Sequence, residues 1–188
     1  MARSTYHHGD LRAVILARAA TLVAERGADG VSLRELARAA GVSHAAPAHH
    51  FTDRRGLFTA LAAQGWRMLA SALAGARPEF IDAALAYTRF ATENPGHYAV
   101  MFDRSLVDTE DPELLAARAA AGHELAAGVA TLDDPRAATD PQAAGLAAWS
   151  LVHGFAMLYL NGVIGTDADP VATAQRVARM LFTEPGAG

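Results

Sequence analysis

Cysteine is absent from this chain of 188 residues. Its absence excludes disulfide bridges, thiolate metal sites and catalysis by a thiol, and it fits a reducing cytoplasm, where we expect the protein to be found. Long apolar stretches are scarce too, because no run of about 18 uninterrupted apolar residues occurs. Residues 1–10 are polar. The sequence therefore predicts neither a transmembrane helix nor a signal peptide.

Lysine is missing as well, so all sixteen basic residues are arginines. An arginine side chain can bond a phosphate through two parallel hydrogen bonds. Residues 1–55 carry eight arginines and five acids, a net charge of +3, whereas residues 56–188 carry eight arginines and fifteen acids, a net charge of −7. A basic end on an acidic body favours the binding of a polyanion at that end alone.

The chain has no convincing strand pattern, and alanine-rich segments with apolar residues at helical spacing run through it. This pattern predicts an all-α fold of about nine helices. Prolines stand near the expected starts of four of them, where a proline costs least. The helices are expected over residues 10–26, 33–40, 44–50, 54–75, 79–93, 95–102, 112–130, 141–163 and 170–182.

The N-terminal part contains the signals of two short helices joined by a tight turn. Ser32 and Glu35 have the spacing of a capping box, and Gly41 can adopt the left-handed conformation that a sharp reversal needs. Ser43 is placed to cap the third helix, whose opening turn contains Pro47 at little expected cost. Two short helices braced by a longer one form a helix-turn-helix, which binds DNA with its second helix in the major groove.

Several segments resemble the tetracycline-repressor (TetR) family. The N-terminal part carries YHHGDLR at 6–12, VSLRELA at 31–37, AGVS at 40–43 and HF at 50–51. In the C-terminal part, ENPGHYAVMF at 93–102 and AAWSLVHG at 147–154 resemble the WHG class of TetR C-terminal domains. The resemblance implies an N-terminal three-helix DNA-binding domain, residues 1–54, followed by a helical bundle for ligand binding and dimerisation, residues 55–188.

Carried onto this chain, the family pattern implies a set of DNA-binding residues in the second and third helices and just after them. They are Ser32, Arg34, Ser43, His44, Ala45, Ala46, His49, His50 and Arg54. The serines, His50 and Arg54 would contact phosphates, while residues 44–46 and His49 would face the groove. Ala48 departs from the pattern, because the family usually has a tyrosine there, and the lost phenol should weaken DNA binding by about 1 kcal/mol.

Aromatic side chains with polar tips, set among small alanines, predict a mostly apolar ligand pocket in the C-terminal part. The candidate lining residues are Trp66, Tyr87, Phe90, Tyr98, Met101, Phe102, Trp149, His153 and Tyr159. Each of them taken singly is more often a residue that fills the core, so the prediction depends on the set.

The segment 141–163 is apolar nearly all round. A helix without a polar face must be covered on two sides. We expect one side to pack on its own core and the other to pack on a second copy of the chain. This homodimer interface would also use residues 170–182.

Together these inferences predict a homodimeric, ligand-responsive transcriptional regulator, most often a repressor in this family. It would bind a near-palindromic DNA operator and be released by a small apolar effector. The alternative is a helical ligand-binding or scaffolding protein with a degenerate DNA-binding head, for which the departure at Ala48 argues.

Neither a cofactor nor a metal is expected. No cysteine or carboxylate completes a metal-ligand set with His49, His50 and the nearby His44. An enzyme is not expected either, because no motif pairs a histidine with a serine or a carboxylate at a telling spacing.

Overall fold

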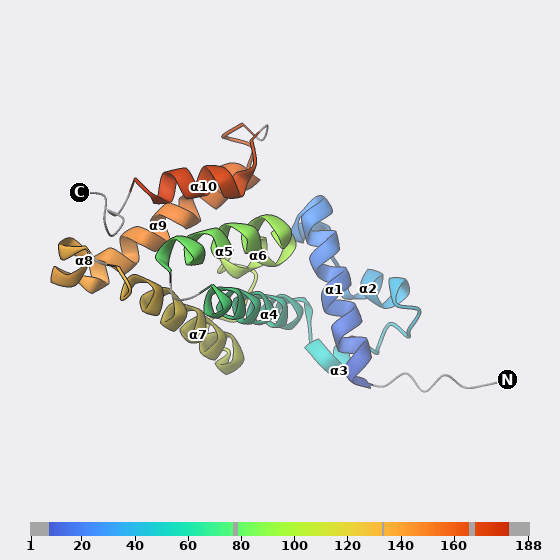
Figure 1. Ribbon diagram of the computed structural model, residues 1–188. Helices are drawn as coiled ribbons and strands as arrows, with labels where there is room; N and C mark the ends of the chain where they lie inside the picture. Colours follow the sequence, from blue (N-terminus) through green and yellow to red (C-terminus); the bar gives the residue numbers. More distant parts are fainter. Residues whose placement is uncertain (1–7, 77–78, 133, 166–167, 181–188) are drawn as a thin grey trace. The chain divides into compact units, whose positions relative to one another are not determined.

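The computed structural model describes residues 8–76, 79–132, 134–165 and 168–180, with side chains from residue 11 onward. In these ranges every regular element is helical, which confirms the predicted all-α fold (Figure 1). The α-helices are α1 His8–Arg26, α2 Leu33–Ala39, α3 Ala48–Phe51, α4 Arg54–Gly75, α5 Phe80–Glu93, α6 Pro95–Met101, α7 Pro112–Val129, α8 Pro135–Thr139, α9 Pro141–Leu160 and α10 Pro170–Ala178. A short 3-10 helix, η1, spans Ala28–Gly30 between α1 and α2.

The chain divides into two compact units. The first unit consists of residues 1–65 and 94–116, and the second unit of residues 66–93 and 117–188. The division therefore falls within α4 and within α7. The domain boundary that we expect after residue 54 stays a prediction.

In the first unit, α1 is the central element. One face of α1 is buried, including Ile15 and Ala19, as the helical spacing of its apolar residues predicts. This helix contacts α2, η1 and α6, and α2 and α3 lie beside it (Figure 1). The three-helix arrangement of a helix-turn-helix head is therefore present.

The contact between α1 and α6 is unusually close. A Cβ atom built on Gly96 would lie 1.9 Å from the carbonyl oxygen of Ala20. Only glycine permits this approach, because nothing in the α1 backbone can move aside for a methyl group. The next residue, His97, is bonded through Nε2 to Oε1 of Gln64 at 3.1 Å. Burial lowers the pKa of His97, so its imidazole is neutral near pH 7.

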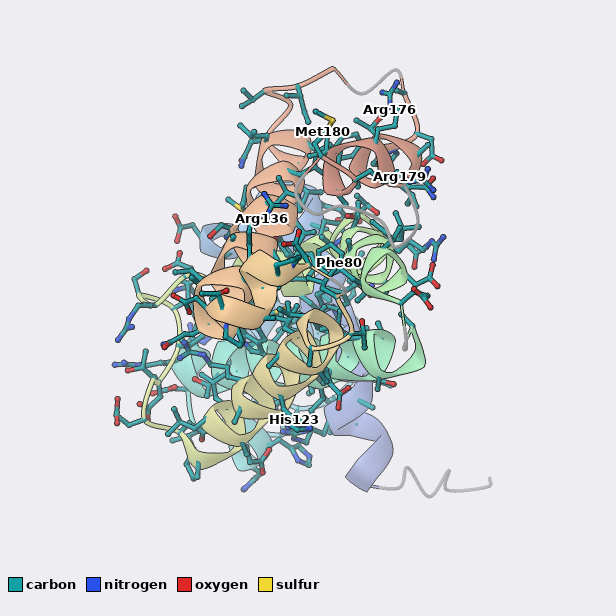
Figure 2. The ribbon with its side chains drawn as sticks, turned by 60° about the vertical axis from the view of Figure 1, so that its left-hand side comes forward. Phe80, His123, Arg136, Arg176, Arg179 and Met180 are labelled. Carbon is teal, nitrogen blue, oxygen red and sulfur yellow. The ribbon has the colours of Figure 1, made fainter. Side chains whose placement is uncertain are left out.

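In the second unit, α5 packs against α9 and α10, while α8 and α10 also pack against α9. Figure 2 shows Phe80, the first residue of α5, in the interior of this unit. Its ring joins a buried cluster of small and branched side chains, which are Val129, Ala137, Ala144 and Ala148. The many alanines let these helices approach closely, and the cluster gives the unit its own apolar core.

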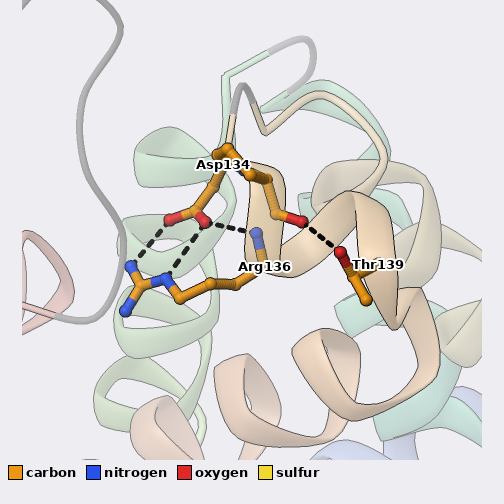
Figure 3. Close-up of polar contacts among 4 residues, drawn as sticks. Asp134, Arg136 and Thr139 are labelled. Carbon is orange, nitrogen blue, oxygen red and sulfur yellow. Dashed lines mark hydrogen bonds and ion pairs between the residues drawn. The ribbon is translucent and has the colours of Figure 1, made fainter.

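Helix α8 lies between the helices predicted over residues 112–130 and 141–163, where no helix was expected. The carboxylate of Asp134 accepts a hydrogen bond from the amide of Arg136 at 2.8 Å and pairs with its guanidinium at 2.7 Å (Figure 3). Thr139 Oγ1 closes the helix by donating to the Pro135 carbonyl. An aspartate before a proline is a known signal for the start of a helix. The sequence could therefore have predicted α8 despite its short length.

The last two helices end earlier than predicted. Helix α9 stops at Leu160 because Gly162 has a φ of 67°. The amide of Val163 then donates to the Leu158 carbonyl at 2.9 Å, and that of Gly162 to Tyr159 at 3.0 Å, which forms a Schellman motif. Helix α10 ends at Ala178, and residues 181–182 of the predicted helix lie outside the described residues.

The close packing of α6 on α1 can be tested by adding one methyl group. We expect Gly96→Ala to lower the free energy of unfolding by about 1–3 kcal/mol, because the new Cβ collides with backbone. Urea denaturation followed by circular dichroism measures this change. The control is Gly122→Ala on α7, where a Cβ meets nothing within 4 Å. There alanine should stabilise by about 0.4–1 kcal/mol, so equal effects of both variants would contradict the packing.

Candidate nucleic-acid interface

The start of α2 is capped by Ser32, whose Oγ accepts a hydrogen bond from the amide of Glu35 at 3.3 Å. The predicted capping box is only half formed, because the Glu35 carboxylate turns to the guanidinium of Arg26 instead. This hydrogen bond holds the pKa of Glu35 below its usual value. The pair ties the end of α1 to α2, and it takes the Glu35 carboxylate away from the backbone amide of Ser32, its partner in a full capping box.

The turn after α2 has the geometry that the sequence predicts. Gly41 has a φ of 67°, a conformation that glycine adopts without strain. The amide of Val42 donates to the Ala37 carbonyl at 3.0 Å, and that of Gly41 to Arg38 at 3.2 Å. These two bonds form a Schellman motif, which ends α2 and reverses the chain.

The recognition segment, residues 44–51, differs from the continuous helix that was predicted over residues 44–50. Only Ala48–Phe51 is α-helical, and residues 44–47 form successive turns. The amide of Ala46 donates to the Ser43 carbonyl at 3.0 Å, and that of Ala48 to Ala45 at 3.1 Å. Pro47 has no amide hydrogen and disfavours the helical conformation of the residue before it, so its cost is larger than expected.

Three of the predicted DNA-binding residues meet in one open depression of about 400 Å³. It is lined by Ser32, Arg34, Glu35, Arg38 and His44. Arg38 was missed by the sequence prediction. It stands four residues after Arg34 on the same helix, a spacing that places both side chains on one face and could have revealed it. The depression therefore offers two guanidinium groups and an imidazole to an anion, while the Glu35 carboxylate in its lining is paired with Arg26.

Exposure separates Ser43 and the remaining predicted residues of the recognition segment. Ser43, Ala45 and His49 are exposed, whereas Ala46 and His50 are half-buried. The exposed ones are accessible to a duplex without any rearrangement of the head. The DNA-binding role of each residue stays a prediction.

Arg54 is engaged within the head. Its Nε donates to the Val31 carbonyl at 3.2 Å and its Nη2 to the Ala28 carbonyl at 2.9 Å. The guanidinium also lies 4.8 Å from the ring centre of Phe58. These contacts brace the segment that leads into α2, and the predicted phosphate contact of Arg54 would have to be made in addition to them.

A second depression, of about 390 Å³, lies beside the end of the recognition segment. Its charged and titratable lining residues are Arg12, His50, Asp53, Arg55, Asp108, Asp111 and Glu113. The stretch that carries Asp108, Asp111 and Glu113 is held there because Arg55 Nη2 donates to the Val107 carbonyl at 3.0 Å. The amide of Asp108 also donates to Thr59 Oγ1 at 2.8 Å. Carboxylates in this depression oppose a phosphate, so the first depression is the better anion site.

Family comparisons agree with this geometry. Residues 15–61 match the family described as "Bacterial regulatory proteins, tetR family", and residues 80–181 match the "Tetracyclin repressor-like, C-terminal domain". The chain belongs to the TetR family. This confirms the family inferred from the sequence motifs, while the narrower WHG class stays a prediction.

Solved structures share the fold of this TetR-family regulator over nearly its whole length. A protein of unknown function from Rhodococcus sp. RHA1 is 34% identical, with a TM-score of 0.75 over 95% of this chain and 97% of its own. A regulatory protein of the tetR family from Rhodococcus RHA1 is 19% identical, with a TM-score of 0.69 over 91% and 94%. The TetR-family regulator PfmR from Thermus thermophilus is 20% identical, with a TM-score of 0.65 over 89% and 96%. No curated protein sequence matches.

The predicted ligand-binding residues of this TetR-family chain divide between the two units. Tyr98, Met101 and Phe102 belong to the first unit, where the rings of Tyr98 and Phe102 lie 4.9 Å apart. The second unit contains the other six, which are Trp66, Tyr87, Phe90, Trp149, His153 and Tyr159. Their role in ligand binding stays a prediction.

In the second unit Tyr87, a fully buried residue, is the centre of a polar chain. Its hydroxyl lies 3.1 Å from Nδ1 of His153 and accepts a hydrogen bond from Nε1 of Trp149 at 3.4 Å. Burial lowers the pKa of His153, so the chain is uncharged near pH 7. A neighbouring apolar cavity, lined in part by Tyr87 and Val152, holds only about 20 Å³, which is room for about one water molecule.

The bracing role of Arg54 can be separated from DNA binding by a stability measurement. Arg54→Ala leaves two backbone carbonyls without their donor, so we expect the free energy of unfolding to fall by about 1–2 kcal/mol. Arg34→Ala, which removes an exposed arginine of α2, should change it by less than about 0.5 kcal/mol. Chemical denaturation of both variants measures their free energies of unfolding. Equal values would show that Arg54 does not brace the segment that leads into α2.

Proposed function

We propose that this TetR-family regulator acts in the cytoplasm as a homodimer that represses transcription from a near-palindromic operator. The observation that carries the proposal is the depression in which Arg34, Arg38 and His44 meet beside the recognition segment. Arginines bind phosphate oxygens through paired hydrogen bonds, and the exposed residues that follow would face the bases. In a symmetric dimer, two such heads would occupy half-sites about 34–36 Å apart.

A homodimer is favoured by the apolar surface of α9. By length and composition α9 is apolar enough to span a membrane. Only 28% of its apolar stretch is buried within the chain itself, so most of that stretch is left for another surface to cover. Its exposed apolar side chains are Leu146 at 61%, Met157 at 39% and Leu158 at 45%. Covering such surface is favourable, so we propose that a second copy packs on it.

The proposed interface continues onto residues that neighbour α9. Val163 is 69% exposed just after α9, and Met180 is 87% exposed just after α10. Figure 2 shows Met180 beside Arg176 and Arg179, so charged side chains accompany this part of the surface. A surface of this kind, both apolar and charged, suits a dimer interface to which each copy contributes two helices. These are the helices predicted over residues 141–163 and 170–182.

We further propose that a small apolar effector controls DNA binding through the helical body. Support comes from the polar chain of Tyr87, His153 and Trp149, which lies among apolar side chains and could orient one polar group of a ligand. An effector can release DNA only if it binds better to the form that does not fit the operator. Regulation in this proposal needs no catalytic activity and no cofactor.

DNA binding is tested with the duplex that the wild-type protein enriches from random-sequence DNA, here named the selected operator. The double variant Arg34→Ala/Arg38→Ala should weaken binding to it by about tenfold for each arginine. It should also reduce the slope of log affinity against log salt by about one for each lost phosphate contact. Fluorescence anisotropy between about 50 and 200 mM salt measures both quantities.

The matched control is Arg89→Ala, an exposed arginine of α5 in the second unit, which should leave the slope unchanged. A wild-type protein that enriches no duplex, or that binds DNA independently of salt, would contradict the proposal. That result would favour instead a helical ligand-binding or scaffolding protein without a working DNA-binding head.

The dimer surface is tested by placing a charge in it. Leu158→Glu should convert the dimer to a monomer, because a carboxylate buried in an apolar interface has no compensating partner. Leu115→Glu on α7 is the matched control, since Leu115 is 44% exposed and Leu158 is 45% exposed. Light scattering after size-exclusion chromatography gives the mass of each. A dimeric Leu158→Glu variant would place the interface elsewhere.

A further inference from the structure

The recognition segment ends in a sharply bent turn at Thr52. This residue has a φ of 60° and a ψ of −60°, a γ-turn conformation that is rare and strained for a branched side chain. Its amide donates to the Ala48 carbonyl at 3.1 Å, so the strained residue closes α3 directly. The amide of Asp53 then donates back to the carbonyl of Phe51. The Phe51 carbonyl is thereby aimed at the first turn of α4.

Gly56 stands where that carbonyl points. A Cβ atom built on Gly56 would lie 2.0 Å from the Phe51 oxygen and 3.0 Å from its carbon, distances at which the backbone must move. The amide of Gly56 also donates to Asp53 Oδ1 at 2.7 Å, which fixes the start of α4 against the same turn. The Thr52 turn therefore exists in this form only because residue 56 has no side chain.

Phe51 is consequently held from two directions. Its ring is buried at 3% exposure, with the Arg12 guanidinium 5.7 Å from the ring centre. Its carbonyl rests against Gly56. Since α3 has only four residues, it cannot hold its own direction and takes it from this end. His49 and His50 immediately precede Phe51, so a displaced carbonyl displaces them as well.

We propose that Gly56 is a positioning residue for operator recognition: by leaving room for the Phe51 carbonyl, it sets where the recognition segment ends and therefore where its side chains meet the bases. The inference rests on the proposed DNA-binding function. Gly56 itself touches no DNA in this proposal. Replacing it should impair discrimination between sequences more than attraction to DNA in general, because the arginines of α2 stay in place.

The experiment compares Gly56→Ala with Gly75→Ala, a glycine of the same helix at which a Cβ meets nothing within 4 Å. For each protein, affinity is measured for the selected operator and for a shuffled duplex of the same length, at a temperature where circular dichroism shows it folded. Gly75→Ala should keep both affinities within about twofold and raise the Tm by about 1–4 °C. Gly56→Ala should lower the affinity for the selected operator by about tenfold or more, while its affinity for the shuffled duplex stays unchanged. Its Tm should not rise.

Three results would count against the inference in different ways. If the wild-type protein discriminates between the duplexes and Gly56→Ala discriminates equally well, the positioning role is wrong while the proposed function stands. If the wild-type protein does not discriminate at all, the proposed function fails, and the inference fails with it. A rise in Tm for Gly56→Ala equal to that for Gly75→Ala would show that the contact with the Phe51 carbonyl does not exist in solution.

A second variant covers the outcome in which Gly56→Ala alone does not fold. In Thr52→Gly/Gly56→Ala, glycine at position 52 allows the turn to take another course and the Phe51 carbonyl to move away from the new Cβ. This variant should fold and bind both duplexes with similar affinity. A folded double variant that still discriminates would overturn the positioning role, and so would failure of both variants to fold, since Gly56 would then serve folding only.

Discussion

A helix of four residues has no stable direction of its own in water, and α3 of this TetR-family regulator, which carries the predicted DNA-binding residues His49 and His50, is such a helix. Its direction comes from the elements around it. Phe51 is held through its ring and its carbonyl, while Arg54 donates to the carbonyls of Ala28 and Val31 and so braces the entry to α2. The head thus depends on backbone contacts that surround the recognition segment more than on the helicity of the segment itself.

Charge is distributed unevenly within the first unit, as it is along the chain. Arg34 and Arg38 share an open depression with His44, whereas Arg55 anchors a stretch that carries Asp108 and Asp111. The acids of this second depression restrict favourable phosphate contact to one side of the head. In the proposed function, electrostatics would therefore add a preferred orientation on the duplex to the overall attraction of the basic N-terminal part.

In the second unit the dominant feature is an apolar helix that its own core covers incompletely. Phe80 and the surrounding alanines bury one side of α9, while Leu146 and Leu158 remain exposed on it. The same unit buries Tyr87 with its polar partners satisfied among themselves. In the proposed regulation, the exposed apolar side of α9 would pack on another copy. The buried, uncharged polar chain around Tyr87 would respond to an apolar molecule.

Local signals in the sequence determined what local energetics can determine. The all-α fold, the Ser32 cap, the glycine turn at Gly41 and the TetR motifs all depend on residues a few positions apart, and the structure confirms them. Tertiary structure alone decided that Arg54 turns inward to the carbonyls of Ala28 and Val31, and that Gly96 packs on the carbonyl of Ala20. The reason is physical: a cap or turn is selected by its own neighbours, whereas the partner of a guanidinium or a carbonyl depends on which distant segment packing brings to it.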